Sequence, residues 1–147
     1  STRFAGIGGR HRRVTSGARA EGRLPSFTPA LAFGWELEGA VQRGRLGAQD
    51  VDAWFTVAEV SARLARAPWT PTLSFGADAA SGDTDAADGT SGTFHQLFPT
   101  AHAHGGYADV VGRQNARERR LVLALAPTRA VSLRAAAHAF GRTSAAD

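Results

Sequence analysis

The 147-residue sequence contains no cysteine, no lysine and no methionine. The lack of cysteine excludes disulfides, zinc fingers and thiolate nucleophiles, and the lack of lysine excludes a Walker A loop and a Schiff base. No apolar run approaches the ~20 residues of a membrane helix or forms the core of a signal peptide. Any contact with a bilayer would therefore be made by strands. The missing initiator methionine predicts that the chain is a processed or excised piece.

Charge is balanced and evenly spread. All seventeen basic residues are arginine, and with thirteen acids they give a net charge of +4. Because the excess is not concentrated in a tail or patch, the sequence predicts no nucleic-acid partner. The hydrophobic content of 43% would support an ordinary core in a soluble domain of this length, so composition does not separate a membrane protein from a soluble one.

Several segments alternate apolar and polar residues with period 2, which predicts antiparallel strands with two different faces. In the clearest, residues 31–42, Leu, Phe, Trp, Leu, Gly and Val alternate with Gly, Glu, Glu, Ala and Gln. In the next segment, residues 54–64, the hydrophobic residues Phe55 and Val57 interrupt the polar face. We expect about eight strands, from clear runs near 31–42, 54–64, 72–79, 120–125 and 131–139 and weaker runs near 3–11, 15–24 and 105–112.

Turn-forming residues separate these runs at 43–47, 67–71 and 126–128, and a long polar loop is expected at about 81–102. Short turns combined with one long loop are typical of outer-membrane barrels. Residues 1–147 are therefore predicted to form a single β-barrel segment. The alanine-rich stretches 58–67 and 135–139 could form helices on propensity alone, but the period-2 pattern on both sides of Pro127 favours strands.

Alternation alone does not determine which face contacts lipid. The same pattern fits a soluble β-sandwich or small barrel that binds a ligand in its interior. Trp35, Trp54 and Trp69 would suit the aromatic girdles of a membrane barrel, or simply the core of a soluble sheet.

A succession of motifs from residue 67 to residue 115 is more specific. It reads APWTP at 67–71, ASGD at 80–83, DG at 88–89, GTF at 92–94, LFPT at 97–100, His102, GYAD at 106–109 and VGRQN at 111–115. This succession resembles the alginate-export family of outer-membrane proteins, and the similarity extends over about residues 15–140. In this chain Ala135, Ala137 and Ala139 replace aromatics typical of the family, which predicts a weaker lipid-facing final strand.

The resemblance implies an all-β, antiparallel up-and-down transmembrane barrel in the bacterial outer membrane. A protein of this family passes an anionic polysaccharide such as alginate outward by facilitated diffusion, without a cofactor or a covalent step. The family's barrel needs about twice this many strands, so we expect the chain to be its C-terminal half. The expected partners are outer-membrane lipid, the anionic polysaccharide, and further barrel strands from the rest of the protein or another copy.

If the apolar faces contact lipid, the polar faces line a pore. Arginines there would stay hydrated and grip carboxylates of the substrate in bidentate fashion. The alternative is that the charges pair across strands and fill a wet interior. The predicted pore-lining residues are Arg63, Arg120, Arg134, Glu36, Glu38, Glu59, Asp78 and Asp109.

Two other constellations are weaker. Asp83, Asp85 and Asp88 offer oxygen donors for a Ca²⁺ ion, but Phe94 stands where an EF-hand has its closing glutamate, which favours a solvated acidic loop. The remaining candidate is a zinc hydrolase site, for which no third ligand has a recognisable spacing, and no G-x-S-x-G elbow is present. We therefore predict no catalytic residue and no enzyme; the hydrolase alternative would use His95, His102, His104 and Asp109.

The last part of the family-like succession is predicted to have a structural role, with Asp109 and Arg113 paired across a strand end. The residues of this loop motif are His102, Tyr107, Arg113, Gln114 and Asn115.

Overall fold

The computed structural model describes residues 3–4, 7–8, 10–26, 28–96 and 112–147. The described residues form strands joined by loops. The strands are β1 (Arg3–Phe4), β2 (Ile7–Gly8), β3 (His11–Leu24), β4 (Leu31–Leu46), β5 (Gln49–Leu64), β6 (Thr72–Ala80), β7 (Thr90–Ser91), β8 (Arg117–Leu125) and β9 (Leu133–Gly141). Among these residues, no helix is long and apolar enough to cross a membrane.

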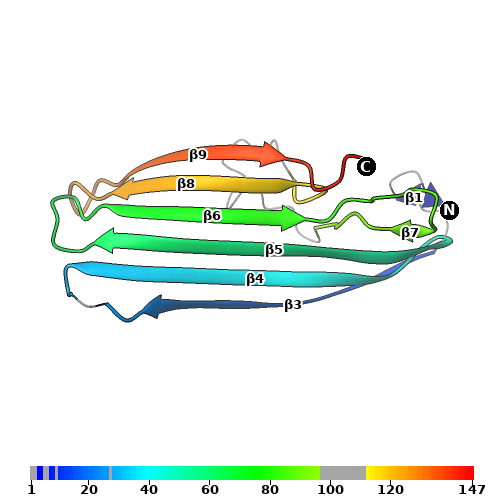
Figure 1. Cartoon of the computed structure of the whole chain (residues 1–147), viewed down its shortest axis with the longest axis horizontal. Coiled ribbons are helices and arrows are strands. Elements are labelled where there is room, and N and C mark those ends of the chain that lie inside the picture. The colour runs from blue at the N-terminus through cyan, green and yellow to red at the C-terminus, as the bar shows by residue number, and fades with distance from the viewer. Residues whose placement is uncertain (1–2, 5–6, 9, 27, 97–111) are drawn as a thin grey trace.

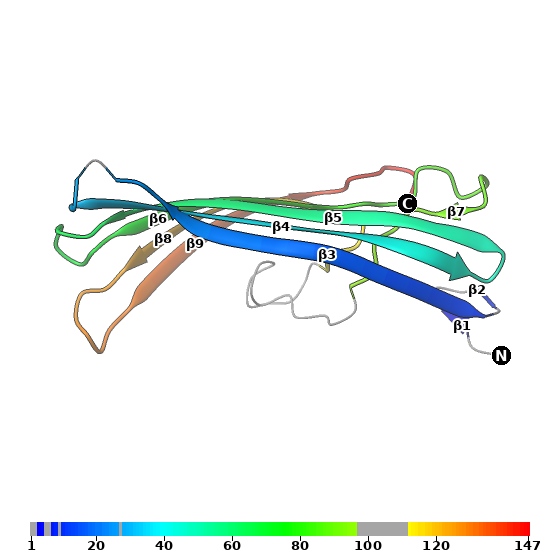
Figure 2. The same ribbon diagram turned by 90° about the horizontal axis from the view of Figure 1, so that it is seen from below.

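Six long strands form one antiparallel sheet in the order β3-β4-β5-β6-β8-β9, so each strand lies beside its neighbour along the chain (Figure 1). The short strand β7 pairs with β5 in parallel, and β1 and β2 pair only with each other. Figure 2 shows the long twisted sheet from its side. The outer edges of β3 and β9 pair with no other described strand. The expected all-β, antiparallel up-and-down fold is confirmed.

Near the N-terminus, strand lengths differ from the sequence-based expectation. The run near 15–24 is a complete strand of 14 residues, β3, whereas the run near 3–11 gives only the two-residue strands β1 and β2 before β3 begins. The run near 105–112 lies outside the described residues except for Gly112. The alanine-rich stretches belong to strands through Leu64 and from Leu133, so the helical alternative is wrong there.

The turn predicted at 43–47 is shorter and lies later, because β4 continues to Leu46 and only Gly47 and Ala48 connect it to β5. Arg43 lies opposite Asp52 and forms an ion pair with it, and the Arg45 Nε lies 3.3 Å from Asp50 Oδ1. These cross-strand pairs keep a Gly- and Arg-rich segment extended. Gly47, with φ 63°, supplies the backbone conformation that a two-residue hairpin turn requires.

Strand register sorts the side chains into two faces, because residues opposite each other in an antiparallel ladder point to the same side. The polar face carries the odd residues of β3 and β5 and the even residues of β4, β6, β8 and β9; the apolar face carries the others. Most exposed large hydrophobic residues lie on the apolar face: Val14, Leu24, Leu37, Val41, Trp54, Val60, Leu64, Leu73, Phe75, Leu121, Leu123 and Leu133.

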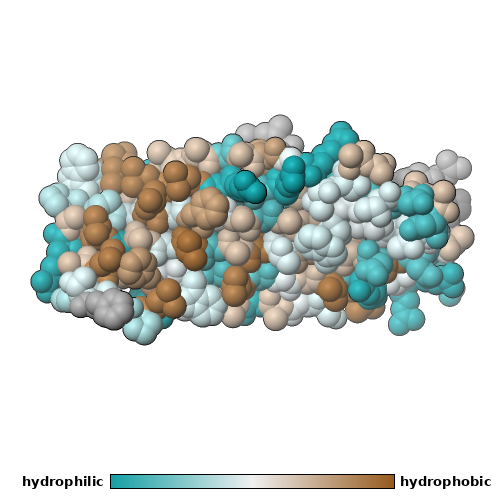
Figure 3. Space-filling view, in the orientation of Figure 1, coloured by the Kyte–Doolittle hydropathy of each residue, from teal (hydrophilic) through white to brown (hydrophobic). Residues whose placement is uncertain are grey.

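The apolar face has a bounded hydrophobic band. On β4 the band extends from Leu31 to Val41, opposite Leu64 to Trp54 on β5. At ~3.3 Å per residue and a tilt of ~45°, a strand segment of this length spans ~25 Å, the height of the lipid-facing band of a membrane barrel. Figure 3 shows hydrophobic residues gathered toward the end of the sheet that carries the β5–β6 and β8–β9 loops, and more hydrophilic surface toward the other end.

A small hydrophobic core lies on the opposite, polar face. The Phe94 ring packs edge-on against the Phe55 ring with centroids 4.9 Å apart, and both are buried. The cluster consists of Ala53, Phe55, Val57, Ala80 and Phe94. The segment after β6 therefore folds back over the polar face, which explains why Phe55 and Val57 interrupt the polar alternation of β5.

Candidate functional site

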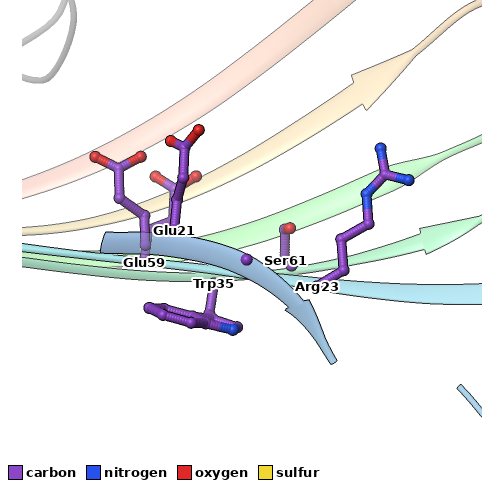
Figure 4. Close-up of a pocket in the computed structure, with 8 residues that line it drawn as sticks. Glu21, Arg23, Trp35, Glu59 and Ser61 are labelled. Carbon is purple, nitrogen blue, oxygen red and sulfur yellow. The ribbon is translucent and has the colours of Figure 1, made fainter. Parts of the chain in front are cut away.

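The centre of the polar face is a double row of charged residues that crosses the sheet. One row, read through the strand register, is Glu21, Glu36, Glu59, Gly76, Arg120 and His138; the next is Arg19, Glu38, Val57, Asp78, Glu118 and Phe140. Figure 4 shows Glu21, Glu59, Ser61 and Arg23 on one side of the sheet and the Trp35 ring on the other. Acids outnumber arginines in these two rows.

Arg120 is the centre of an ion-pair network. Its Nη1 donates to Asp78 Oδ1 at 2.7 Å, and its Nη2 and Nε donate to Glu59 Oε2 at 2.9 and 3.2 Å. Its Nη1 also lies 3.8 Å from Glu118 Oε2. The Arg120 side chain is only 3% exposed. The expectation that this arginine stays hydrated is therefore wrong, because three carboxylates have replaced water around the guanidinium.

Two neighbours shape this network. Gly76 lies beneath the guanidinium, where a Cβ atom would come within 2.5 Å of Arg120 Cζ. The missing side chain therefore provides the space that the guanidinium occupies. On the far side, Glu118 is hydrogen-bonded to His138 Nδ1. The network thus links β5, β6, β8 and β9 through side chains as well as through the backbone ladder.

Arg113 extends the network from the loop that precedes β8. Its Nη2 lies 3.7 Å from Asp78 Oδ2, and its guanidinium lies over the Phe55 ring, 5.2 Å from the centroid. The predicted partner, Asp109, is outside the described residues.

A second, smaller ion-pair group lies on β3 and β4. The Nη2 of Arg19 lies 2.9 Å from Glu21 Oε2 and 3.2 Å from Glu36 Oε2. Beside it is a hollow of about 380 Å³ whose lining includes Arg23, Glu59 and Ser61 (Figure 4). Hydrogen-bonding groups of both charge signs line this hollow, as would suit a hydrated wall.

Toward the β5–β6 and β8–β9 loops, the polar face becomes cationic. Arg63 and Arg134 belong to one row through Thr72 and Ala124, and Arg23 lies in the adjacent row. All three are exposed, and none forms an ion pair with another residue that the structure describes. We call Arg23, Arg63 and Arg134 the arginine rim. Their guanidinium groups face solvent, unlike that of Arg120.

At the opposite end, Gln42 fixes the folded-back segment to the polar face. Its Nε2 donates to the His95 carbonyl oxygen at 2.6 Å, and its Oε1 accepts the His95 N–H at 2.9 Å. The same Nε2 lies 3.0 Å from Thr15 Oγ1, and the Gln42 side chain is fully buried. The Gln42 amide thus pairs with both the N–H and the carbonyl group of His95, as a residue of an adjacent antiparallel strand would. Burial and the nearby Arg13 lower the pKa of His95 below its ordinary value of 6.5.

The C-terminal residues are held by Asn115, which has φ 47°. Its Oδ1 accepts the backbone N–H groups of Thr143 and Ser144 at 3.1 and 2.7 Å, and its Nδ2 donates to the Ser144 carbonyl oxygen at 2.9 Å. Thr143 in turn donates its hydroxyl to the Ala80 carbonyl oxygen at 2.7 Å. Asn115 thus joins the end of β6 to the segment after β9, while Gln114 beside it is exposed.

The acidic loop organises its own backbone. Asp83, Asp85 and Asp88 each accept a hydrogen bond, at 2.7–3.1 Å, from the N–H two residues further along the chain. Among the described residues, no group of three potential metal ligands lies close enough to hold an ion. The residues His102, His104 and Tyr107 lie outside the part of the chain that the structure describes.

Sequence reasoning missed the contribution of β3 and of the first half of β8. The polar face also includes Arg13, Arg19, Glu21, Arg23 and Glu118. The signal was present, since Arg13, Thr15, Gly17, Arg19, Glu21 and Arg23 alternate without interruption. It was obscured because the intervening residues are Val, Ser, Ala, Ala and Gly, which form a weak apolar side.

An antiparallel up-and-down sheet with an exposed hydrophobic band on one face and a hydrated charged wall on the other is the arrangement of a transmembrane β-barrel wall. The chain matches the model of the alginate export family over residues 2–147 and belongs to that family. This is a family of transport proteins, and its members' role is alginate export. No curated protein and no solved structure shows significant similarity to the chain.

Proposed function

We propose that this chain is part of the wall of an outer-membrane channel through which an anionic polysaccharide such as alginate diffuses out of a bacterial cell. The observation that carries the proposal is the division between the two faces. Hydrophobic residues stay exposed over a band of membrane height, while the polar face buries Gln42, Glu118 and Arg120. A bilayer outside and a wet lumen inside account for both properties.

The arginine rim is the proposed contact for the polymer. Arg23, Arg63 and Arg134 are exposed at one end of the lumen wall and are not neutralised by a described carboxylate. A guanidinium remains charged at any physiological pH and binds a carboxylate with two parallel hydrogen bonds. In contrast, Arg120 and Arg19 are already engaged by protein carboxylates. We therefore assign polymer recruitment to the rim and wall structure to the central rows.

The folded-back segment is the proposed constriction. Residues 92–96, which follow β7, lie on the polar face near the tight β4–β5 hairpin, held by Phe94 in its small core and by the Gln42–His95 hydrogen bonds. A segment fixed on the lumen side of the wall reduces the cross-section open to a polymer. Its anchoring should consequently affect conductance.

Further strands complete the proposed channel, because unpaired backbone groups in lipid cost several kcal/mol each. The free edges of β3 and β9 would pair with strands from the rest of the protein or from another copy. Bilayer lipid is the partner of the apolar face. The transport step requires no cofactor, because diffusion through a lumen makes and breaks no covalent bond.

Planar-bilayer recordings test this assignment. Replacing Arg63 and Arg134 by Glu should shift the reversal potential toward cation preference and reduce block by uronate oligomers. The effect should shrink in 1 M salt, where the screening length is ~3 Å. Arg119→Glu is the control, because this exposed arginine lies on the apolar side of β8. Unchanged selectivity in the double variant, with normal insertion, would refute the lumen position of the rim.

A further inference from the structure

A hollow on the outside of the sheet is not explained by transport. It measures about 510 Å³ and lies where β3 and β4 meet the β4–β5 hairpin. Four arginines contribute to its lining together with one hydrophobic side chain; they are Arg10, Arg12, Arg43, Arg45 and Val14. The register places Arg12, Val14, Arg43 and Arg45 on the apolar face, so the hollow opens away from the lumen wall.

Local backbone geometry brings the four arginines together. At Gly44 a Cβ atom would lie 2.1 Å from the Arg12 carbonyl oxygen, so only glycine allows β3 and β4 to approach this closely. The Gly47 N–H donates to the Arg10 carbonyl oxygen at 3.2 Å, which continues the ladder by one more step. Because side chains alternate along a strand, Arg10 then points to the same side as Arg12.

The hollow carries an excess of positive charge. Arg43 and Arg45 are each paired with an aspartate on β5, Asp52 and Asp50. Arg10 and Arg12 are exposed, and neither forms an ion pair with any residue that the structure describes. Two guanidinium groups are therefore available, each a planar donor that matches the geometry of a phosphate.

The position of the hollow indicates the ligand. Val14 lies in its lining. The hydrophobic band ends at the cross-strand pair Val41 and Trp54, and the next pair on the same face is Arg43 and Asp52. A molecule seated there would meet hydrocarbon-like surface on one side and guanidinium groups on the other. A membrane lipid with an anionic phosphate headgroup has this division, whereas a polysaccharide lacks the apolar part and would be in the lumen.

We propose that Arg10 and Arg12, supported by Arg43 and Arg45, bind the phosphate of an anionic membrane lipid whose acyl chains lie along the hydrophobic band. This rests on the proposed membrane position of the apolar face. The site fixes the height of the wall in the bilayer, because it places a headgroup contact at the first charged position beyond the band.

Native mass spectrometry of the whole detergent-solubilised protein tests the site by titration with phosphatidylglycerol, with zwitterionic phosphatidylcholine in parallel. Arg10→Ala/Arg12→Ala should weaken phosphatidylglycerol retention by roughly 30-fold, since each arginine near an anionic lipid surface contributes about fivefold. Phosphatidylcholine retention should change little. The matched control is Arg66→Ala/Arg129→Ala, which removes the same charge from two exposed loop positions at the other end of the sheet.

Three results would overturn the proposal. An equal loss of phosphatidylglycerol retention in the control would indicate general electrostatic attraction, and unchanged retention in the Arg10/Arg12 variant would show that these arginines do not bind the lipid. Displacement of the lipid by millimolar inorganic phosphate would indicate a site for the free ion. Arg10→Gln/Arg12→Gln provides a second variant with a polar side chain. Channel insertion and conductance are recorded for each variant. If an Arg10/Arg12 variant conducts normally and still retains phosphatidylglycerol, only the proposed lipid site is refuted. If the wild-type protein never inserts into the bilayer, the proposed channel function is refuted.

Discussion

Replacement of Arg120 by Ala would remove the cation that Glu59, Asp78 and Glu118 share. The Asp78 and Glu118 side chains are 9% and 7% exposed and Glu59 is 31% exposed, so water cannot fully replace the lost partner. Removing one member of a buried ion pair costs about 3–5 kcal/mol. We expect about 3 kcal/mol, at the lower end, because Glu59 retains access to solvent.

The assay is equilibrium unfolding in lipid vesicles with urea, followed by tryptophan fluorescence. Arg63→Ala is the matched control: it removes the same charge from the same face, but Arg63 is exposed and makes no ion pair with a described residue. Its loss should stay within about 0.5 kcal/mol. Equal losses in Arg120→Ala and Arg63→Ala would refute the reasoning.

A combined variant separates charge burial from packing. The variant combines Glu59→Gln, Asp78→Asn and Arg120→Met, and so removes the three charges that contact each other most closely. Most of the stability lost in Arg120→Ala should therefore return. Gly76→Ala offers an independent check, since its Cβ would lie 2.5 Å from Arg120 Cζ and displace the guanidinium. It should destabilise in the same direction without changing any charge.

Three further predictions concern the band, the anchored segment and pH. Val60 lies on the apolar face and is 56% exposed, so Val60→Arg should cost ~2–4 kcal/mol of folding free energy in vesicles if it lies near the bilayer centre. Ser61→Arg on the polar face should cost much less. Equal costs would contradict the assignment of the two faces. Gln42→Ala removes both hydrogen bonds from its side chain to the His95 backbone, so residues 92–96 should be cleaved faster in limited proteolysis. The exposed control variant Gln114→Ala should be cleaved there at the wild-type rate. Because the pKa of His95 is lowered below 6.5, the unfolded chain takes up a proton before the folded one. The stability contribution of neutral His95 should be fully present above pH 6.5 and be lost as the pH falls through its lowered folded pKa. Over this range the urea midpoint of the wild type should fall relative to that of His95→Gln, and a pH-independent difference would contradict this.

Alternation along the chain was sufficient to predict an antiparallel all-β fold and the two faces of its clearest strands. The run from Leu31 to Val41, with glutamates between its hydrophobic residues, has only one regular solution, a strand with one apolar side, because side chains of a strand alternate strictly. The order of motifs from residue 67 to 115 was likewise sufficient to predict the family. Neither inference needed a contact between distant residues.

Only the tertiary structure decided what each polar-face charge does. In the alternating sequence pattern, Arg63 and Arg120 both occupy the polar side of a strand and cannot be distinguished. In the structure Arg63 is exposed, whereas Arg120 is buried among Glu59, Asp78 and Glu118. The difference arises from register, which places Gly76 of β6, Asp78 of β6 and Glu59 of β5 around Arg120. The row of Arg63 has Thr72 and Ala124 at the corresponding positions. Register depends on pairing between strands far apart in sequence, and a single strand carries no information about its neighbours' positions.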